Sequence, residues 1–246
     1  KKYKNNKFIL QLLKMNELNI YLIGGNSTIG QAILKGVEKK YRDSKKHVTS
    51  FIRNKYDDLP PGECIQVNEY KEALNWIVNQ SKKTSSKTLV IVSFGVLREE
   101  IKAESFQENI KFHLDINTFK TKELLDQFAT LENVLEIHIV SSILADFIRP
   151  SIYSYSISKK MLELFIKESI NKEIYKSKLF IWKPAFVKSR LNQNREPSFI
   201  KTNPLNIEKI VSKKYVSGSY YIPSYSIIFT KIAKFSSPFI KLLDKK

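Results

Sequence analysis

Cysteine is nearly absent from this sequence of 246 residues, and histidine is scarce. Cys64 is the only cysteine, so no disulfide can form within the chain, and we expect a reducing compartment such as the cytoplasm. The three histidines, His47, His113 and His138, do not cluster with Cys64 at the spacing of metal ligands. The sequence therefore predicts no metal site.

Long apolar runs are missing as well. One long uncharged stretch, 215–230, contains Gly218, Pro223 and several serines, and it is too short and too polar to span a bilayer. A GxSxG elbow, which would indicate a serine hydrolase, is also absent. Because no internal repeat or inter-domain linker interrupts the pattern, we expect one domain at 15–246. The basic stretch 1–14 is interpreted as an N-terminal extension ahead of Met15.

Acidic residues are few, with 24 Asp and Glu against 42 Lys and Arg, which gives a net charge of +18. Such a field attracts phosphates, anionic lipids or acidic substrates. The basic residues are nearly all lysine and are spread along the chain beside many Asn and Ile, so we favour a genome-wide composition bias as their explanation. No RNP strand or pair of zinc cysteines is present, and we predict no specific nucleic-acid partner.

Short apolar runs alternate with helical patterns along most of the chain. The runs predict strands at 20–23, 48–52, 64–67, 89–92, 135–140 and 179–182, with a short one near Tyr220. The helical patterns lie at 29–41, 69–80, 105–128 (broken near Leu114) and 153–171. Continuous Ile, Val and Leu in several runs is typical of buried parallel strands. The alternation predicts an α/β fold, a Rossmann-type doubly wound parallel sheet of about seven strands.

The first predicted strand runs directly into a glycine-containing turn and then a helix. A turn of this kind points backbone N–H groups and a helix N-terminus at a pyrophosphate. The alternative is a turn that only serves packing. We expect this turn to bind a nucleotide cofactor through Gly24, Asn26, Ser27, Thr28, Ile29 and Gly30.

The end of the second predicted strand lacks the acidic residue that usually holds the adenosine ribose hydroxyls of NAD. The segment 50–54 reads Ser-Phe-Ile-Arg-Asn, and Arg53 stands where a 2′-phosphate would arrive. A guanidinium binds phosphate through several charged hydrogen bonds. The segment therefore favours NADP(H) over NAD(H), with a solvated surface arginine as the alternative interpretation.

The stretch IYSYSISKK, residues 152–160, places Tyr155 and Lys159 four residues apart, on one face of a helix. A nearby ammonium stabilises phenolate and lowers a tyrosine pKa from its free value of about 10. The strand before this helix ends at Ser142, and strand ends of a doubly wound sheet face the ligand crevice. Ser142 and Tyr155 are therefore expected to meet over a bound carbonyl group.

These motifs together resemble the short-chain dehydrogenase/reductase family from about residue 18 to the end. The resemblance implies Asn117, Ser142, Tyr155 and Lys159 as catalytic residues, and it adds Gly95, Pro184 and Val187 to the cofactor site, where Tyr155 and Lys159 also contribute. The sequence departs from the family pattern at several positions. These are Ile23 and Thr28 in the glycine turn, Ser93 and Phe94 after the fourth strand, and Ala185 after the sixth.

A closer likeness is to the reductase partner of decaprenylphosphoryl-ribose 2-epimerase and to related reductases of bacterial surface polysaccharides. It is carried by GGNSTIG, by FGVL after the fourth strand and by the C-terminal segment 221–246. The resemblance implies NADPH-dependent reduction of a ketone, a keto-sugar on a lipid carrier, with Tyr155 as proton donor. An inactive nucleotide-binding scaffold is the alternative, and homo-oligomers are common in the family.

The C-terminal segment 221–246 mixes bulky apolar residues with lysines. Asp244 is its one acidic residue after Thr230, against Lys231, Lys234 and three further lysines. Such a segment can lie in a membrane interface with its lysine stems reaching the headgroups, or its apolar residues can cover the sheet or an oligomer contact. The first interpretation predicts peripheral binding at the inner face of the membrane.

Overall fold

The structure is a computed structural model of the chain. It describes residues 17–54, 60, 62–100, 105–171, 174–192, 195, 200–214 and 216–235. The predicted extension 1–14 and the last part of the C-terminal segment, 236–246, lie outside the described residues.

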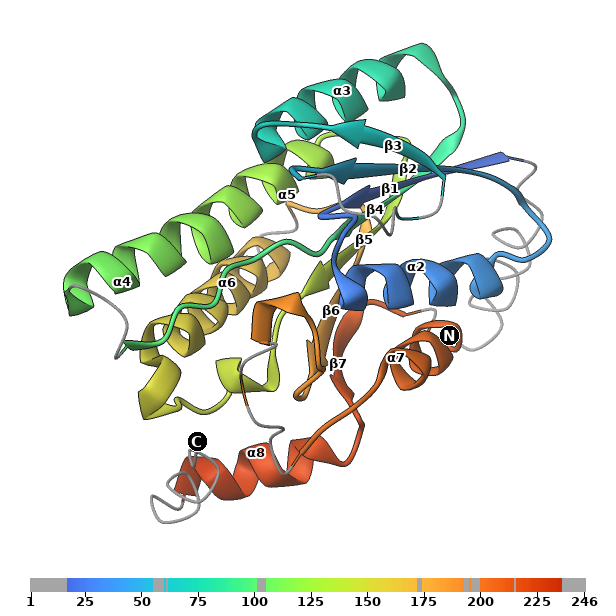
Figure 1. Ribbon diagram of the computed structural model, residues 1–246. Coiled ribbons are helices and arrows are strands. Elements are labelled where there is room, and N and C mark those ends of the chain that lie inside the picture. Colours follow the sequence, from blue (N-terminus) through green and yellow to red (C-terminus); the bar gives the residue numbers. More distant parts are fainter. Residues whose placement is uncertain are drawn as a thin grey trace.

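Seven strands among the described residues form one sheet, in which every neighbouring pair is parallel (Figure 1). In chain order they are β1 (Glu17–Ile23), β2 (Lys45–Ile52), β3 (Glu63–Gln66), β4 (Lys87–Val92), β5 (Val134–Val140), β6 (Lys178–Pro184) and β7 (Gly218–Ile222). The spatial order β3-β2-β1-β4-β5-β6-β7 is that of a doubly wound sheet, with its switch point between β1 and β4. The predicted fold class and all seven predicted strands are confirmed.

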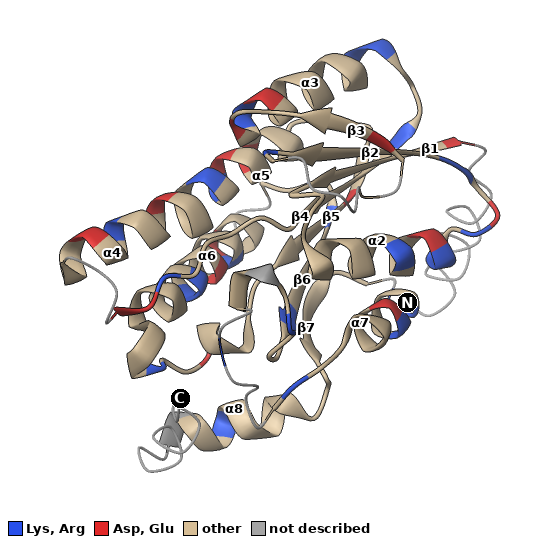
Figure 2. Cartoon of the chain, in the orientation of Figure 1, with Lys and Arg blue, Asp and Glu red and all other residues tan. Residues whose placement is uncertain are grey.

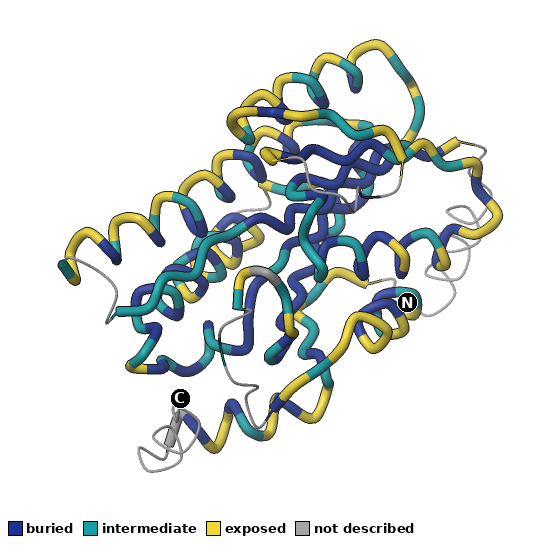
Figure 3. The backbone as a smooth tube through the Cα atoms, in the orientation of Figure 1, coloured by how far each residue is buried: buried dark blue, intermediate teal, exposed yellow. Residues whose placement is uncertain are grey.

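Helices cover both faces of the sheet (Figure 1). One face carries α3 (Tyr70–Lys83), α4 (Phe106–Leu114), α5 (Thr121–Ala129) and α6 (Tyr153–Asn171), and the other carries α2 (Thr28–Lys40) and α7 (Pro204–Val211). Each face has its own apolar core, because alternate residues of every strand point to opposite sides. The strands between the two helical layers are accordingly the most buried part of the chain (Figure 3).

A π-helical turn, Asp115–Lys120, joins α4 to α5 where the sequence predicts a break near Leu114. Two helices were not predicted, α7 and α8 (Ser226–Phe235). The N-terminus of α7 is capped by the side chain of Asn203, which accepts a hydrogen bond from the Asn206 N–H, and Pro204 occupies the first helical position. Short helices of this kind carry too little periodicity to stand out in the sequence.

Lys and Arg residues lie on helices that cover both faces of the sheet (Figure 2). The positive charge is thus distributed over many elements, as the spread of lysines along the sequence indicates.

Candidate active site

A cavity of about 280 Å3 opens at the carboxyl ends of the central strands. Its walls come from the turn after β1 and from the segments that follow β2, β4, β5 and β6. Doubly wound sheets bind their ligands at this edge, beside the switch point of the strand order. Sequence-predicted residues that line the cavity are Gly24, Asn26, Ser27, Thr28, Ile29, Arg53, Gly95, Ser142, Tyr155, Lys159, Pro184 and Val187.

The turn after β1 is shaped by two glycines with different roles. Gly24 has φ +86°, a backbone conformation that favours glycine, and a Cβ there would lie 2.9 Å from the backbone nitrogen of Phe94. A Cβ on Gly30 would lie 2.1 Å from the hydroxyl oxygen of Ser93. Gly30 therefore packs against the end of β4 rather than lining the cavity, although the sequence places it in the cofactor set.

The N-terminus of α2 faces the cavity through Ser27, Thr28 and Ile29. Ser27 caps this helix, and its hydroxyl accepts a hydrogen bond from the Gly30 N–H at 3.1 Å. The partial positive charge of a helix N-terminus favours a phosphate group. The close glycine turn and the capped helix thus fit the pyrophosphate of a dinucleotide. Thr28 stands where the short-chain dehydrogenase/reductase family, which the sequence resembles, has glycine.

Arg53 lies at the end of β2 and interacts with an aromatic pair that the sequence did not indicate. Its guanidinium carbon is 5.1 Å from the ring centroid of Tyr70, and that ring stacks on Phe94 with centroids 3.8 Å apart. The side chain of Asn26 donates to the Asn54 carbonyl at 2.7 Å, which ties the glycine turn to the end of β2. Tyr70 and Phe94 also line the cavity, so its β2 end combines a cation with flat apolar surface.

Asn117 is fully buried in the π-helical turn, behind Gly95. Its side-chain amide accepts from the Val96 N–H at 2.9 Å and donates to the Val96 carbonyl at 3.0 Å. It also donates to the hydroxyl of Ser158 at 3.0 Å. Asn117 does not line the cavity itself, and its contacts fix the segment after β4 against α6, next to Lys159.

Ser142, Tyr155 and Lys159 meet at one side of the cavity, as their spacing predicts. The Ser142 hydroxyl hydrogen-bonds to the Tyr155 phenol and accepts from the Leu144 N–H at 3.2 Å. The Lys159 ammonium donates to the Val140 carbonyl at 3.1 Å and lies 5.9 Å from the Tyr155 ring centroid. A serine, a tyrosine and a lysine are thus placed around one point where a small carbonyl group can bind.

The pKa of Tyr155 differs from the sequence expectation. Burial raises this pKa to about 12, although the hydrogen bond from Ser142 opposes the rise, so the expected lowering by Lys159 does not prevail. Burial also lowers the pKa of Lys159 to about 8, against the charge of Glu163. At neutral pH the site therefore holds a protonated phenol beside an ammonium group, and this form of the tyrosine can donate a proton.

His113 packs edge-on against the Tyr155 ring, with centroids 6.3 Å apart. Its Nε2 accepts from the Arg98 N–H at 3.0 Å, so Nδ1 carries the proton and donates to the Asn109 carbonyl at 2.8 Å. Both ring nitrogens are thereby used by the neutral imidazole, and burial lowers the pKa of His113. This histidine supports the tyrosine ring, a role that its position in the sequence did not reveal.

The far end of the cavity is mainly apolar and includes two arginines, Arg149 and Arg195. Arg149 is buried, and Arg195 pairs with Glu99 at 2.9 Å. Apolar residues that the sequence analysis did not single out here are Leu97, Ile143, Leu144, Phe147, Ile152, Phe186, Leu191 and Ile200. None of the described residues that line the cavity is acidic, whereas Arg53, Arg149, Lys159 and Arg195 are basic.

No group of three or more His, Cys, Asp or Glu side chains among the described residues is arranged to hold a metal ion.

No protein-family model matches the chain, and no curated protein matches it. Solved structures do match. A short-chain dehydrogenase from Burkholderia cenocepacia in complex with NADP is 17% identical, over 94% of this chain and 98% of that chain, with a TM-score of 0.70. Thermoplasma acidophilum aldohexose dehydrogenase is 15% identical, over 86% and 95% of the two chains, with a TM-score of 0.65.

A third similar structure is angucycline C-6 ketoreductase LanV with bound NADP, which is 14% identical over 84% of this chain and 95% of that chain, with a TM-score of 0.63. At these identities the likeness shows the fold. The chain has the Rossmann-type fold of the short-chain dehydrogenases.

Proposed function

We propose that the protein is an NADP(H)-dependent oxidoreductase that reduces a ketone to an alcohol. The observation that carries this proposal is the meeting of Ser142, Tyr155 and Lys159 at the cavity whose other end is formed by the glycine turn and the N-terminus of α2. Bound NADPH would supply the hydride. The fold and the solved relatives named above, several of them dehydrogenases or reductases, support the same reaction class.

Different residues bind the carbonyl oxygen and protonate it in this proposal. Tyr155 is protonated at neutral pH and gives its proton to the oxygen as negative charge develops there. The Ser142 hydroxyl holds and polarises the same oxygen. Lys159 carries a positive charge near the phenolate that Tyr155 becomes, and Asn117 keeps α6 in register with the segment after β4.

Replacing Tyr155 by Phe tests this assignment. We expect kcat to fall by roughly a hundredfold or more, because the proton donor is lost, while NADPH affinity, measured by fluorescence titration, stays within a few-fold of wild type. Tyr153→Phe is the matched control on the same helix, because the Tyr153 ring packs on Phe106, 5.6 Å between centroids. A wild type that binds NADPH and reduces no carbonyl compound would favour the inactive scaffold.

Arg53 supports NADP(H) over NAD(H), because its guanidinium lies at the β2 end of the cavity and none of the described residues that line the cavity there is acidic. Arg53→Ala should narrow the difference in affinity between NADPH and NADH by roughly tenfold or more, the loss of one charged phosphate contact. Equal affinity of the wild type for both cofactors would contradict this assignment.

We further propose an anionic keto-sugar as the substrate, carried on a lipid phosphate. The basic Arg149 and Arg195 at the far end of the cavity, together with its apolar walls, support a ligand that is both anionic and partly apolar. The other support is the sequence resemblance to reductases of lipid-linked sugars, which GGNSTIG and FGVL carry.

Helix α8 supports peripheral contact with a membrane. Phe229 and Ala233 on its inner side pack against residues that all line the cavity, namely Ile143, Phe147, Ala185 and Ile200. Its outer side exposes Ile228 and Ile232, with Lys231 beside them. No helix among the described residues is long and apolar enough to cross a bilayer. An apolar face with a neighbouring cation is suited to an anionic lipid surface, next to the cavity.

Vesicle sedimentation tests this contact. We expect binding to vesicles rich in phosphatidylglycerol, weaker binding at high salt and little binding to phosphatidylcholine. The double change Ile228→Glu and Ile232→Glu should abolish binding, whereas Ile174→Glu, at a similarly exposed isoleucine away from α8, should not. A protein that stays in the supernatant at low salt would leave α8 a packing role, and a shift to dimers would indicate a second copy as the partner.

A further inference from the structure

The end of β5 is joined to α6 by three successive contacts. Residues 140–142 of the strand end bond to three side chains that are spaced four residues apart, and therefore lie along one side of the helix. The pairs are Tyr155 with Ser142, Lys159 with Val140, and Glu163 with Ser141. Two of these contacts involve the proposed catalytic residues, whereas the third, through Glu163, has no assigned role.

Glu163 belongs to an ionic network behind the cavity, in which Lys183 is buried and the two carboxylates, Glu163 and Asp146, are partly buried. One carboxylate oxygen accepts a hydrogen bond from the Ser141 hydroxyl, and the other pairs with the Lys183 ammonium at 2.7 Å. Lys183 also pairs with Asp146 at 2.7 Å, and Asp146 accepts from the Tyr221 hydroxyl at 2.8 Å. The Lys183 side chain is only 4% exposed, so its charge is held by these two carboxylates.

We propose that Glu163, held by Lys183, is a positioning residue for Tyr155 and Lys159. It fixes α6 on the end of β5 and places a carboxylate one helical turn from Lys159. The proposal rests on the proposed function for the roles of Tyr155 and Lys159. Its geometry does not depend on that function, because the three contacts exist whatever the substrate is.

Among the charged groups around Lys159, Glu163 is the carboxylate that affects the Lys159 pKa. The titratable groups facing this region are Tyr155 and Glu163 from α6, His113 from α4, Lys183 from β6 and Asp146 from the turn that follows β5. His113 is neutral. Asp146 is engaged by Lys183 and Tyr221. Burial lowers the pKa of Lys159, and the charge of Glu163 opposes that fall.

The ionised form of Glu163 is itself favoured by its partners. Burial raises the pKa of this carboxyl, and Lys183 and Ser141 oppose the rise. Burial on its own would lower the pKa of Lys183. The effects of Glu163 and Asp146 are larger than that of burial, so the pKa of the Lys183 amine is raised. The Lys183 ammonium therefore stays charged at 2.7 Å from the Glu163 carboxylate, which is the arrangement of an ion pair, and the charge of this carboxylate opposes the fall in the Lys159 pKa.

The test is a titration of Lys159 that needs no turnover. In protein labelled with 13C at the lysine Cε, the signal of Lys159 is assigned by its loss in Lys159→Met, and its midpoint is followed with pH. We expect Glu163→Gln to lower this midpoint by roughly one unit, since a nearby negative charge is removed. Glu168→Gln is the matched control, an exposed glutamate on the same helix, and it should leave the midpoint unchanged.

Glu163→Asp keeps the charge and should give a midpoint above that of Glu163→Gln. If Glu163→Gln does not fold, Glu163→Asp is compared with wild type, and a smaller downward shift is expected. An unchanged midpoint in the folded Glu163→Gln protein, or an equal shift in Glu168→Gln, would overturn the proposal.

Kinetics add a second measurement. The kcat of Glu163→Gln relative to wild type should fall as the pH rises from about 6 to 8, because the variant loses the Lys159 proton at a lower pH. A ratio that is the same at every pH would indicate a merely structural role. Absence of any reductase activity in the wild type would contradict the proposed function alone, since the titration would still report on Glu163.

Discussion

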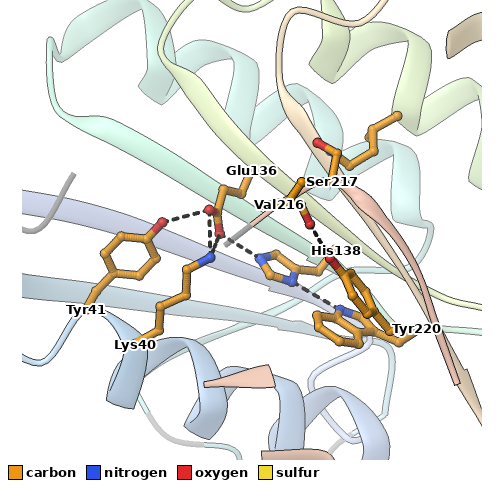
Figure 4. A network of polar contacts seen from close by, with 9 residues as sticks. Lys40, Tyr41, Glu136, His138, Val216, Ser217 and Tyr220 are labelled. Atoms are coloured by element: carbon orange, nitrogen blue, oxygen red, sulfur yellow. Dashed lines mark hydrogen bonds and ion pairs between the residues drawn. The ribbon is translucent and has the colours of Figure 1, made fainter. Parts of the chain in front are cut away.

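Lys40 and Lys159 are equally buried, each 3% exposed, yet they have very different partners. The Lys40 ammonium lies 2.8 and 2.9 Å from the two carboxylate oxygens of Glu136 (Figure 4). The Lys159 ammonium donates to a backbone carbonyl, that of Val140, and the carboxylate that acts on it, Glu163, is itself paired with Lys183. The two lysines lie on different elements, the first at the end of α2 and the second in α6 beside the cavity.

The network around Lys40 is complete. Glu136 also accepts from the Tyr41 hydroxyl at 2.7 Å and from His138 Nε2 at 3.2 Å (Figure 4). The Trp182 indole donates to the other nitrogen of His138 at 3.1 Å. Burial alone would raise the pKa of Glu136, but His138 and Lys40 lower it to about 2. Both charged groups, the Lys40 ammonium and the Glu136 carboxylate, thus have a partner of opposite charge or a hydrogen-bond donor, which is the arrangement expected of a structural network.

Burial lowers the pKa of both lysines. At Lys40 the Glu136 carboxylate opposes the fall through its charge and a direct hydrogen bond, whereas at Lys159 the opposition comes from the charge of Glu163 alone, and the pKa falls to about 8. A buried cation that borders a cavity and has no carboxylate of its own is a feature of functional sites, because its charge is then available to a ligand or a reacting group. Lys40 therefore stabilises the fold, whereas Lys159 is held by the fold at the cavity.

The largest expected effect comes from breaking the complete network. Lys40→Met leaves the Glu136 carboxylate buried without its cation and should lower the free energy of unfolding by about 3–5 kcal/mol. The kcat of the folded protein should not change, because the network does not touch the cavity. Urea unfolding with a parallel activity assay measures both. Lys39→Met is the control, since the neighbouring Lys39 side chain is 67% exposed, and it should cost less than about 1 kcal/mol.

The two networks also show what the sequence was able to predict. The seven strands were found because buried parallel strands are nearly continuous apolar runs. The runs of β5 and β6 nevertheless contain Glu136, His138 and Lys183, all buried. The partner of Glu136 lies 96 residues away in the sequence, and no local pattern connects two such positions.

The candidate site was predictable where its residues obey a fixed spacing. Tyr155 and Lys159 share a helix face, and Ser142 ends a strand, so their meeting follows from the fold. Tyr70 and Arg149 were missed. Tyr70 is the first residue of α3 and Arg149 lies in the segment before α6, and neither position follows a fixed spacing that points to the cavity. One signal was available for Arg149, since it lies between Ser142 and Tyr155, in the segment that follows a strand end.

A smaller effect of opposite sign is expected at Lys159. Its pKa is lowered from 10.5 to about 8 in the folded protein, so below pH 8 the protein carries the full cost of the buried charge, roughly 3 kcal/mol. Between pH 8 and 10.5 the unfolded chain binds the extra proton, and wild-type stability rises with pH. Lys159→Met should therefore raise the free energy of unfolding by about 2–3 kcal/mol at pH 7, and the gain should shrink toward pH 10.5.

Lys160→Met controls for the substitution itself, because Lys160 is exposed on the same helix. It should change stability little at either pH. A Lys159→Met protein that is less stable than wild type at pH 7 would show that Lys159 is as well paired as Lys40, and the contrast between the two lysines would fail.

The smallest effects come from two tyrosines that make the same contact in the two networks. The Tyr41 hydroxyl donates to Glu136 at 2.7 Å and the Tyr221 hydroxyl donates to Asp146 at 2.8 Å. Each carboxylate keeps a lysine after the change to Phe, so each substitution should cost only about 1–1.5 kcal/mol of stability in urea unfolding. Their effects on the reaction should differ. Tyr221→Phe loosens Asp146, the second partner of the Lys183 that holds Glu163, and should lower kcat, whereas Tyr41→Phe should leave it unchanged. Equal kcat values in the two variants would mean that the network of Glu163, Lys183 and Asp146, like the network around Lys40, contributes to stability alone.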